Sequence, residues 1–277
     1  MREYQMITSS SNSQIKRLLQ LKKKGKERDR EGVFLAEGFK MFLEAPAESL
    51  VKVYVSAGFY EREEHRKALE GHEFEVVSDA VFASISDTRT PQGILCVVRQ
   101  SHYQVADLTA GGVPLCLVLE NLQDPGNLGT ILRTAEGAGV TGVLLSDGCV
   151  DIYNPKVIRS TMGSIYRMPF CYTDDLPGVV SEWKREGIAV LAAHLQGVNT
   201  YDREDYRRPA AFLIGNESRG LTKETAELAD HFIRIPMHGK VESLNAAAAA
   251  AILMYEAGRQ RGWPEEGKRS LRGSEVF

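Results

Sequence analysis

The sequence predicts an α/β fold with two unequal domains: a larger C-terminal domain built on a parallel sheet and a smaller α/β domain before it. In residues 113–277, short apolar runs alternate with segments of helical periodicity, which is the pattern of βαβ units around a parallel sheet. A polar stretch with a glycine pair, residues 101–112, separates this part from a shorter α/β segment. The 277 residues are enough for two ordinary domains.

The formal net charge of the chain is −3, but the charge is unevenly distributed. Residues 1–28 carry eight Lys or Arg against two Glu, a net charge of +6. A basic arm on a nearly neutral body indicates contact with nucleic acid, although a frayed, solvated helix has the same composition. The candidate nucleic-acid contacts in this arm are Lys16, Arg17, Lys22, Lys23 and Lys24.

The cysteine pattern favours a reduced, cytoplasmic protein without a metal site. The four cysteines are scattered, and none belongs to a C-x-x-C pair or to another metal-binding spacing. The N-terminus lacks the apolar block of a signal peptide, and no apolar run reaches the length of a membrane span. The sequence therefore predicts neither a membrane nor a metal partner.

The small domain is predicted to start with a helix over residues 9–24, because Ile15 and three leucines recur at helical spacing and Ser11 or Asn12 can cap it. The charged stretch 25–32 predicts a mobile segment. Beyond it we expect a strand that runs into a helix ending at Pro46, strands at 51–55, 73–77 and 94–98, and helices at 61–69 and 80–85.

The large domain shows a tighter alternation. Strands are predicted at 115–120, 142–145, 167–172, 189–193, 211–214 and 232–235. Helices are predicted at 129–137, 155–165, 178–186, 223–229 and 244–260. Such alternation predicts a mostly parallel sheet that helices cover on both faces.

Three loops at the ends of predicted strands gather polar residues and glycines. We call residues 120–138, 212–221 and 233–245 the first, second and third motif. Ligand sites of open α/β sheets lie at such strand ends. Gly215 and Pro236 leave main-chain N–H and C=O groups outside the sheet, and these can bind an adenine edge and an amino-acid moiety. Each motif taken singly is equally well explained as a capped turn.

Ordinary nucleotide-binding and hydrolase signatures are absent from the sequence. No G-x-G-x-x-G follows a strand, no G-x-x-x-x-G-K-[ST] occurs, and no Ser-His-Asp arrangement stands out. These absences remove the main support for dinucleotide-binding, P-loop and serine-hydrolase functions.

Together and in this order, the three motifs resemble those of the SpoU/TrmH branch of the SPOUT methyltransferases, which are RNA ribose 2′-O-methyltransferases. The first motif is similar to N-x-x-D-P-x-N-x-G-x-x-x-R-T-A, the second to I-G-x-E-x-x-G-L and the third to I-P-M-x-G-x-x-x-S-L-N. The N-terminal part resembles the family's L30e-like substrate-binding domain through Ser11-x-x-x-x-Lys16 and the F-L-A-E-G run at 34–38.

The resemblance implies a basic N-terminal helical arm (1–28), an L30e-like RNA substrate-binding domain (29–104), a linker (105–112) and a SPOUT domain with a trefoil knot (113–277). It further implies S-adenosylmethionine as cofactor, RNA as substrate and a homodimer formed through the knotted domain, with the active site near the subunit interface. The run of alanines at 246–251 is compatible with close packing against a threaded loop, although helix propensity alone explains it.

The site residues follow from the matched positions. Main-chain groups near Gly215, Ile235 and Leu244 are expected to hold the cofactor, with Asn216 and Met237 beside them. The loop around His194 and Leu195 is a weaker candidate. The candidate catalytic residues are Arg133, Asn127, Glu217, Ser243 and Asn245.

A ribose 2′-OH is a poor nucleophile until a proton leaves it. The family assigns the catalytic role to Arg133, but a guanidinium pKa above about 12 makes it a costly base. We therefore expect Arg133 to bind an RNA phosphate and stabilise the developing oxyanion, while the proton passes to a phosphate oxygen, water or Glu217. Asn127 would orient Arg133 or the ribose, and Glu217 could equally be a structural cap. Ser243 and Asn245 would position the substrate or the start of the last helix.

By analogy with the family, the separate L30e-like domain favours 23S ribosomal RNA as substrate. A tRNA 2′-O-methyltransferase, or an rRNA enzyme conferring antibiotic resistance, is the alternative within the same class. From other classes, a catalytically silent RNA-binding factor for ribosome assembly and a small-molecule α/β enzyme stay open.

Overall fold

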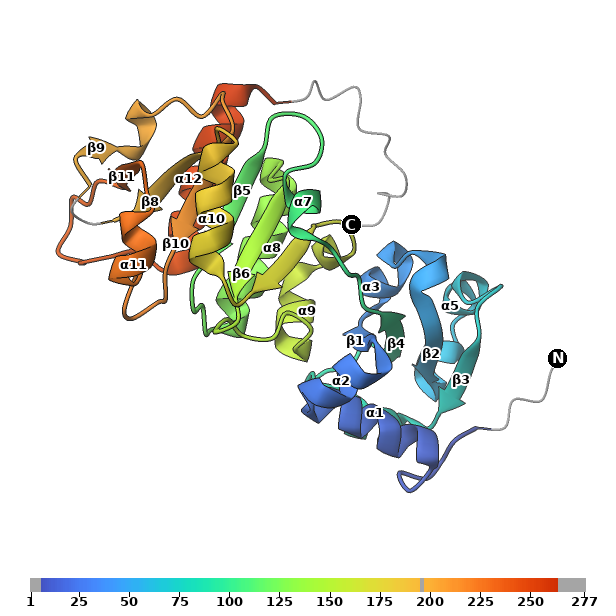
Figure 1. Ribbon diagram of the computed structural model, residues 1–277. Coiled ribbons are helices and arrows are strands. Elements are labelled where there is room, and N and C mark those ends of the chain that lie inside the picture. The colour runs from blue at the N-terminus through green and yellow to red at the C-terminus, as the bar shows by residue number, and fades with distance from the viewer. Residues whose placement is uncertain (1–5, 195–196, 264–277) are drawn as a thin grey trace.

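The computed structural model describes residues 6–194 and 197–263, so Leu195 lies outside the described part of the chain. Figure 1 shows an N-terminal α/β domain, drawn in blue to teal, beside a larger α/β domain, drawn in green to red. Each domain has its own sheet. The segment between them contains α7 (Val105–Leu108), whose Leu108 is fully buried against the large sheet at Gly142.

The small domain is built on a four-stranded mixed sheet of order β1-β4-β2-β3. Strand β4 runs antiparallel to β1 and β2, and β3 runs parallel to β2. The strands are β1 (Val33–Glu37), β2 (Leu50–Ser56), β3 (Phe74–Val77) and β4 (Ile94–Arg99). The helices are α1 (Ser13–Lys23), α2 (Gly25–Glu31), α3 (Phe39–Glu44), α4 (Ala57–Tyr60), α5 (Glu63–Ala68) and α6 (Asp79–Ile85).

The described part of the basic arm, residues 6–28, is built into the small domain. Asn12 caps α1, since its Oδ1 accepts a hydrogen bond from the Gln14 N–H at 2.8 Å. Ile15, Leu18 and Leu21 are fully buried in one cluster with side chains of β1, β2 and α6. The apolar stripe of α1 therefore forms part of the core, while Lys16 and Lys23 face outward.

Residues 25–31 form α2, whereas the charge run had predicted a mobile segment. Arg28 explains the difference, because its side chain is only 4% exposed. It donates to the Leu21 carbonyl at 2.6 Å and pairs with Asp151 of the large domain. Acceptors on another helix and in the other domain leave no trace in the local sequence pattern.

The large domain is built on a seven-stranded, all-parallel sheet of order β7-β6-β5-β10-β8-β11-β9. The strands are β5 (Leu115–Leu119), β6 (Gly142–Ser146), β7 (Phe170–Thr173), β8 (Ala189–Ala193), β9 (Asn199–Thr200), β10 (Ala210–Ile214) and β11 (His231–Arg234). The helices are α8 (Pro125–Ala138), α9 (Pro155–Thr161), α10 (Leu176–Arg185), α11 (Lys223–Glu227) and α12 (Ala246–Arg261).

Helices cover both faces of this sheet. Buried side chains of α8, α9 and α12 share one core cluster with Leu117 of β5 and Phe212 of β10. Side chains of α7 and α10, and Leu228 directly after α11, pack with Val118 and Leu213, which point to the opposite face of the same strands. The predicted α/β architecture, with a large parallel sheet and a smaller N-terminal sheet, is confirmed.

The largest differences from the predicted boundaries in the large domain are at the start of α8, the end of α9 and the start of β7. Helix α8 starts four residues early, at Pro125, because Asp124 caps it by accepting the Asn127 N–H at 2.7 Å and proline suits the first helical position. Helix α9 ends at Thr161, because Met162 and Gly163 have left-handed backbones with φ of 50° and 98°. The strand predicted at 167–172 accordingly starts at Phe170.

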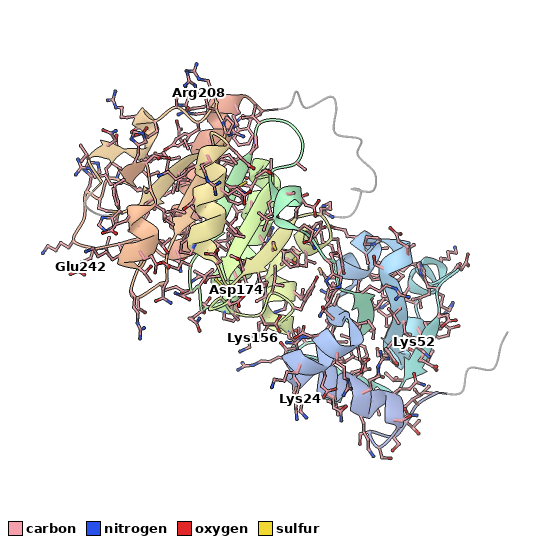
Figure 2. The ribbon with its side chains drawn as sticks, in the orientation of Figure 1. Lys24, Lys52, Lys156, Asp174, Arg208 and Glu242 are labelled. Carbon is pink, nitrogen blue, oxygen red and sulfur yellow. The ribbon has the colours of Figure 1, made fainter. Side chains whose placement is uncertain are left out.

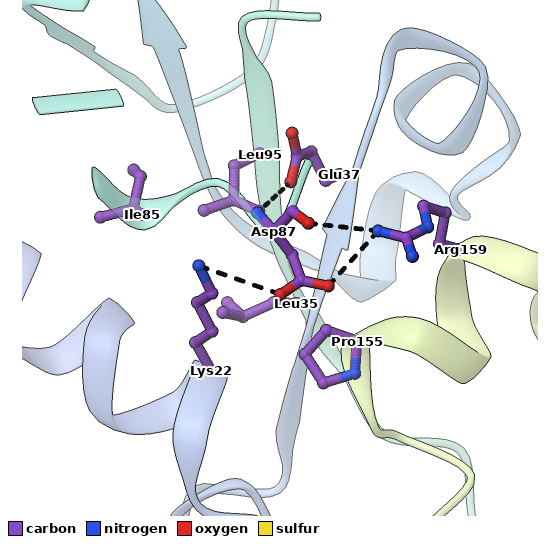
Figure 3. A pocket seen from close by; sticks show the side chains of 8 residues that line it. All are labelled: Lys22, Leu35, Glu37, Ile85, Asp87, Leu95, Pro155 and Arg159. Atoms are coloured by element: carbon purple, nitrogen blue, oxygen red, sulfur yellow. Dashed lines mark hydrogen bonds and ion pairs between the residues drawn. The ribbon is translucent and has the colours of Figure 1, made fainter. Parts of the chain in front are cut away.

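The two domains contact each other directly. Phe34 of β1 stacks on Tyr153 with ring centroids 4.8 Å apart, and the Tyr153 hydroxyl accepts the Ser101 N–H at 2.8 Å. Figure 3 shows a second contact, in which Asp87 of the small domain lies between Lys22, 4.0 Å away, and Arg159 of α9, 3.4 Å away. Aromatic packing and charge pairing thus fix where the small domain sits.

Helix α12 is anchored at its C-terminal end. The Arg261 guanidinium donates to four main-chain carbonyls at 2.7–2.9 Å, those of Tyr206, Val113, Pro114 and Arg208. These bonds join the last described helix to the starts of β5 and β10. Among the described residues, no helix is long and apolar enough to cross a membrane.

Helices α8 and α9 pack so closely at Gly129 that an added methyl group there should lower the stability of the protein. A Cβ at Gly129 would overlap the Ser160 Cβ and lie 2.6 Å from the Val157 carbonyl oxygen. We expect Gly129→Ala to destabilise the protein by about 1–3 kcal/mol through overpacking, measured as a lower midpoint of thermal unfolding. Gly137→Ala is the matched control in the same helix, where a Cβ would lie 3.6 Å from the Tyr255 hydroxyl. A drop of the same size in both variants would contradict this account.

Candidate active site

The three motifs meet at one edge of the large sheet. Strands β5, β10, β8 and β11 are neighbours and all run parallel, so the segments that follow them leave the sheet on the same side. Those segments begin with Glu120, Gly215, His194 and Ile235 respectively. Ligand sites of open α/β sheets lie at this position.

The second motif forms a closed turn after β10. Asn216 and Gly220 exchange two main-chain hydrogen bonds of 3.0 and 2.9 Å. The Asn216 Oδ1 accepts the N–H groups of Ser218 and Arg219 at 2.9 and 3.1 Å, and its Nδ2 donates to the Asn121 carbonyl. A Cβ at Gly215 would overlap the backbone at Gly220. The turn therefore requires glycine where the chain leaves the strand.

The Glu217 carboxylate joins the second motif to the first. It accepts the N–H groups of Gln123 and Asp124 at 3.1 and 2.9 Å and the Asn127 Nδ2 at 3.1 Å. Partial burial raises the pKa of the Glu217 carboxyl, but the hydrogen bonds from Asp124, Asn127 and Gln123 outweigh it and hold the pKa below its ordinary value. Glu217 is therefore ionised at neutral pH and already satisfied by donors.

Asn245 adds the third motif to this group. Its Nδ2 donates to the Asn127 Oδ1 at 2.8 Å, while its Oδ1 accepts the N–H groups of Ala247 and Ala248 at the start of α12. One continuous hydrogen-bond chain thus runs from α12 through α8 to the turn after β10. Asn127, in the first turn of α8, donates to Glu217 with its Nδ2 and accepts from Asn245 with its Oδ1.

Glu120, which was not among the predicted site residues, binds the threonines that directly follow the second motif. Its carboxylate is 6% exposed and accepts from the Thr222 N–H and hydroxyl, both at 2.7 Å, and from the Thr225 hydroxyl. These threonines begin α11, directly after the turn. A carboxylate that ends an otherwise apolar strand was the signal that could have identified it.

The loop between β11 and α12 offers main-chain groups to a ligand. Within the described part of the chain, residues 235–244 make no main-chain hydrogen bond to another main-chain group. Ile235, Met237 and Leu244 are half-buried there, and Ser243 is exposed. His194 lies at the same sheet edge, where its N–H donates to the Ile233 carbonyl at 2.9 Å. The free donors and acceptors, next to the glycine turn, fit a cofactor held by main-chain groups.

Arg133 lies apart from the chain that joins Glu217, Asn127 and Asn245. It is six residues beyond Asn127 on α8, is exposed, and forms no hydrogen bond or ion pair with any described residue. It lines a separate pocket between α3 of the small domain and the helices of the large domain. Within one chain, the Arg133 guanidinium is therefore not in contact with the side chains of Glu217, Asn127 and Asn245.

The candidate RNA-binding residues of the arm divide into two groups. Lys16, Lys23 and Lys24 are exposed on or just after α1, and Figure 2 shows Lys24 at the surface of the small domain. Arg17 pairs with Glu31 at 2.6 Å, and Lys22 donates to the Ser86 carbonyl. The first group is free to meet a phosphate, whereas the second already has partners in the small domain.

No cluster of three or more His, Cys, Asp or Glu side chains within residues 6–194 and 197–263 is arranged to hold a metal ion. The four cysteines carry free thiols, three of them buried.

A parallel α/β domain with three polar motifs at one sheet edge, joined to a small α/β domain, defines the class of SPOUT RNA methyltransferases. The chain belongs to the SpoU rRNA methylase family, whose model matches residues 114–255. A second model, the MRM3-like substrate binding domain, matches residues 12–96. The protein is an RNA methyltransferase, and its cofactor is S-adenosylmethionine.

Named relatives and solved structures are similar to this chain over most of its length. It is 36% identical over 253 residues to the 23S rRNA (guanosine(2553)-2′-O)-methyltransferase RlmP of Bacillus subtilis, covering 90% of this chain and 97% of that protein. The AdoMet-bound rRNA methyltransferase of Sinorhizobium meliloti superposes with a TM-score of 0.79 at 30% identity, covering 92% and 98% of the two chains. The AdoMet complex of AviRb from Streptomyces viridochromogenes gives 0.81 at 26% identity, covering 90% and 98%.

The lowered pKa of Glu217 predicts a pH-dependent contribution to stability. A carboxyl whose pKa is depressed by folding stabilises the fold above its ordinary pKa and loses this contribution as pH falls through the folded value. We expect Glu217→Gln to lower the midpoint of thermal unfolding at neutral pH, and the deficit relative to wild type to shrink below pH 4.5. Glu70→Gln, at an exposed position without a side-chain hydrogen bond among the described residues, measures the background of the same charge change. A deficit that stays constant with pH would refute the role of the Glu217 carboxylate.

Proposed function

We propose that this protein transfers a methyl group from S-adenosylmethionine to a ribose 2′-OH of 23S ribosomal RNA. The observation that carries the proposal is the convergence of three sequence motifs on one edge of the parallel sheet, where main-chain groups are free and polar side chains are linked in one chain. The printed name of the Bacillus subtilis relative, a 23S rRNA 2′-O-methyltransferase, supports the choice of reaction and RNA.

In this proposal the cofactor is held by main-chain groups at Gly215, Ile235 and Leu244, with Asn216, Met237 and His194 at the same sheet edge. S-adenosylmethionine supplies an electrophilic methyl group on a sulfonium. The hydrogen bonds of Glu217, Asn127 and Asn245 keep the three motifs in register around it. Ser243, which is exposed beside Leu244, is free to contact the substrate.

Arg133 binds the RNA phosphate and stabilises the oxyanion that develops at the ribose. It carries no partner among the described residues, so its donors are available to the substrate. Glu217 is a poor proton acceptor, because its carboxylate already accepts three hydrogen bonds of 2.9–3.1 Å and its pKa is lowered. The proton therefore passes to a phosphate oxygen or to water.

The proposal includes a homodimer formed through the large domain, in the cytoplasm. Tyr255 of α12 is 48% exposed, and Trp263, which follows the end of α12, is 47% exposed. Their ring centroids lie 5.4 Å apart, so the two rings form an apolar surface on this helix. The separation of Arg133 from Asn127 and Glu217 within one chain favours an active site that two chains complete. Sedimentation of the purified protein tests this state directly.

The proposed reaction predicts methylation of a single class of RNA. Purified protein, labelled S-adenosylmethionine and RNA from a strain that lacks this protein should give labelled 23S rRNA. After alkaline hydrolysis the label should remain in a dinucleotide, because a methylated 2′-OH cannot attack the neighbouring phosphodiester bond. Label in tRNA would support the alternative substrate. Binding of RNA without any label would support a silent assembly factor and contradict the proposal.

The role of Arg133 predicts a loss of turnover in a conservative variant. Lysine keeps the charge but not the planar fork of donors, so we expect Arg133→Lys to slow single-turnover methyl transfer about 100-fold or more. The affinity for S-adenosylmethionine, measured by calorimetry, should stay unchanged, because Arg133 has no contact with the second or the third motif. Turnover near the wild-type rate would exclude any role that needs the guanidinium geometry.

A further inference from the structure

The pocket that contains Arg133 is formed by both domains. It has a volume of about 320 Å³ and lies between α3 of the small domain and α8, the turn after α9, and α12 of the large domain. Lys40 and Glu44 come from α3, and Arg133, Glu136 and Arg167 come from the large domain. One residue attributed to catalysis thus shares a cavity with the substrate-binding domain of the same chain.

The charges in this pocket do not balance. Arg167 bridges the two carboxylates, with its Nη1 2.9 Å from Glu44 and its Nε 2.9 Å from Glu136. Lys40 lies 3.6 Å from the same Glu44. Three cations therefore face two carboxylates, and Arg133 is the cation that no described side chain neutralises. A cavity with this excess charge is suited to an anion.

The contact between the domains holds the cations in place. Gly163 has a left-handed backbone with φ of 98°, which favours glycine, and the Glu44 carboxylate packs against it. The Tyr166 hydroxyl donates to the Met41 carbonyl at 3.0 Å beside it. Ser164 also lines the pocket, is 2% exposed, and has a hydroxyl without a hydrogen-bond partner among the described residues. The pocket is thus a built feature of the domain contact rather than a surface gap.

Building on the proposed function, we infer that this pocket binds a backbone phosphate of the substrate RNA, and that Arg167 and Lys40 are binding residues beside Arg133. The Arg167 guanidinium uses its Nε and Nη1 for the two carboxylates, and its side chain is still 46% exposed, so further N–H donors can reach a phosphate oxygen. Glu44 and Glu136 hold its fork in one orientation. The RNA would therefore be held across the domain boundary, next to the residue that acts on the ribose.

Salt-dependent RNA binding tests this inference. We expect Arg167→Gln and Lys40→Gln each to weaken binding of 23S rRNA, taken from a strain lacking the protein, about 10-fold or more. The slope of log affinity against log salt should fall by about 0.7–0.9 for each lost phosphate contact. Affinity for S-adenosylmethionine should not change, since the partners of the two residues are Glu44 and Glu136 and not the proposed cofactor positions at Gly215, Ile235 and Leu244.

Two variants separate phosphate binding from a purely structural role. Glu44→Gln removes the carboxylate shared by both cations but keeps the cations, so RNA should bind at least as tightly as to wild type, with the salt slope retained. Lys67→Gln is matched to Lys40→Gln, because Lys67 is an exposed lysine in an i,i+4 pair with Glu63 of the same domain, outside the pocket. It should leave RNA affinity nearly unchanged.

Three results would overturn the inference. If Glu44→Gln and Arg167→Gln weaken RNA binding equally without a change of slope, the cluster only docks the domains. If Arg167→Gln or Lys40→Gln instead shifts the monomer–dimer equilibrium in sedimentation and leaves RNA binding intact, the pocket is a protein contact. If the wild-type protein methylates 23S rRNA and both cation variants bind it normally, the phosphate site fails while the proposed function stands.

Discussion

The geometry of the site depends on the hydrogen-bond chain from Asn245 through Asn127 to Glu217. Its two bonds join residues 90 and 118 positions apart, which belong to α8, the turn after β10 and the start of α12. Each bond is partly exposed and contributes modestly by itself. Because Asn127 serves both neighbours with one amide, loss of any member leaves the next without its partner, and the motifs lose their common register.

The buried carboxylate of Glu120 adds a second set of hydrogen bonds at the same sheet edge. It fixes the threonines at the start of α11, so the turn after β10 is held on one side by Glu217 and on the other by Glu120. The turn itself needs glycine at 215 and closes with two main-chain bonds. A cofactor that binds main-chain groups would therefore meet a frame that is already ordered.

Much of the fold followed from pattern, and the exceptions have physical reasons. Alternating strands and helices correctly predicted the parallel sheet, and the motifs that carried the family resemblance meet at one sheet edge. The helix over residues 25–31 was not predicted, because Arg28 finds its acceptors in α1 and in the other domain. Arg167 was read as part of a strand, because its partners Glu44 and Glu136 lie 123 and 31 residues away. The trefoil knot stays a prediction from the resemblance, since no local pattern encodes threading.

The four hydrogen bonds of Arg261 determine from which end helix α12 can unfold locally. Because the end of α12 is bound to the starts of β5 and β10, the helix cannot fray from that end without disturbing the centre of the sheet. Its other end begins at Asn245, where the preceding loop makes no main-chain bonds with the described residues. Local unfolding will therefore start at the N-terminal end of the helix and not at its C-terminal end. If the cofactor binds at the 235–244 loop as proposed, its exchange for the demethylated product requires movement of this loop and no unfolding of the sheet.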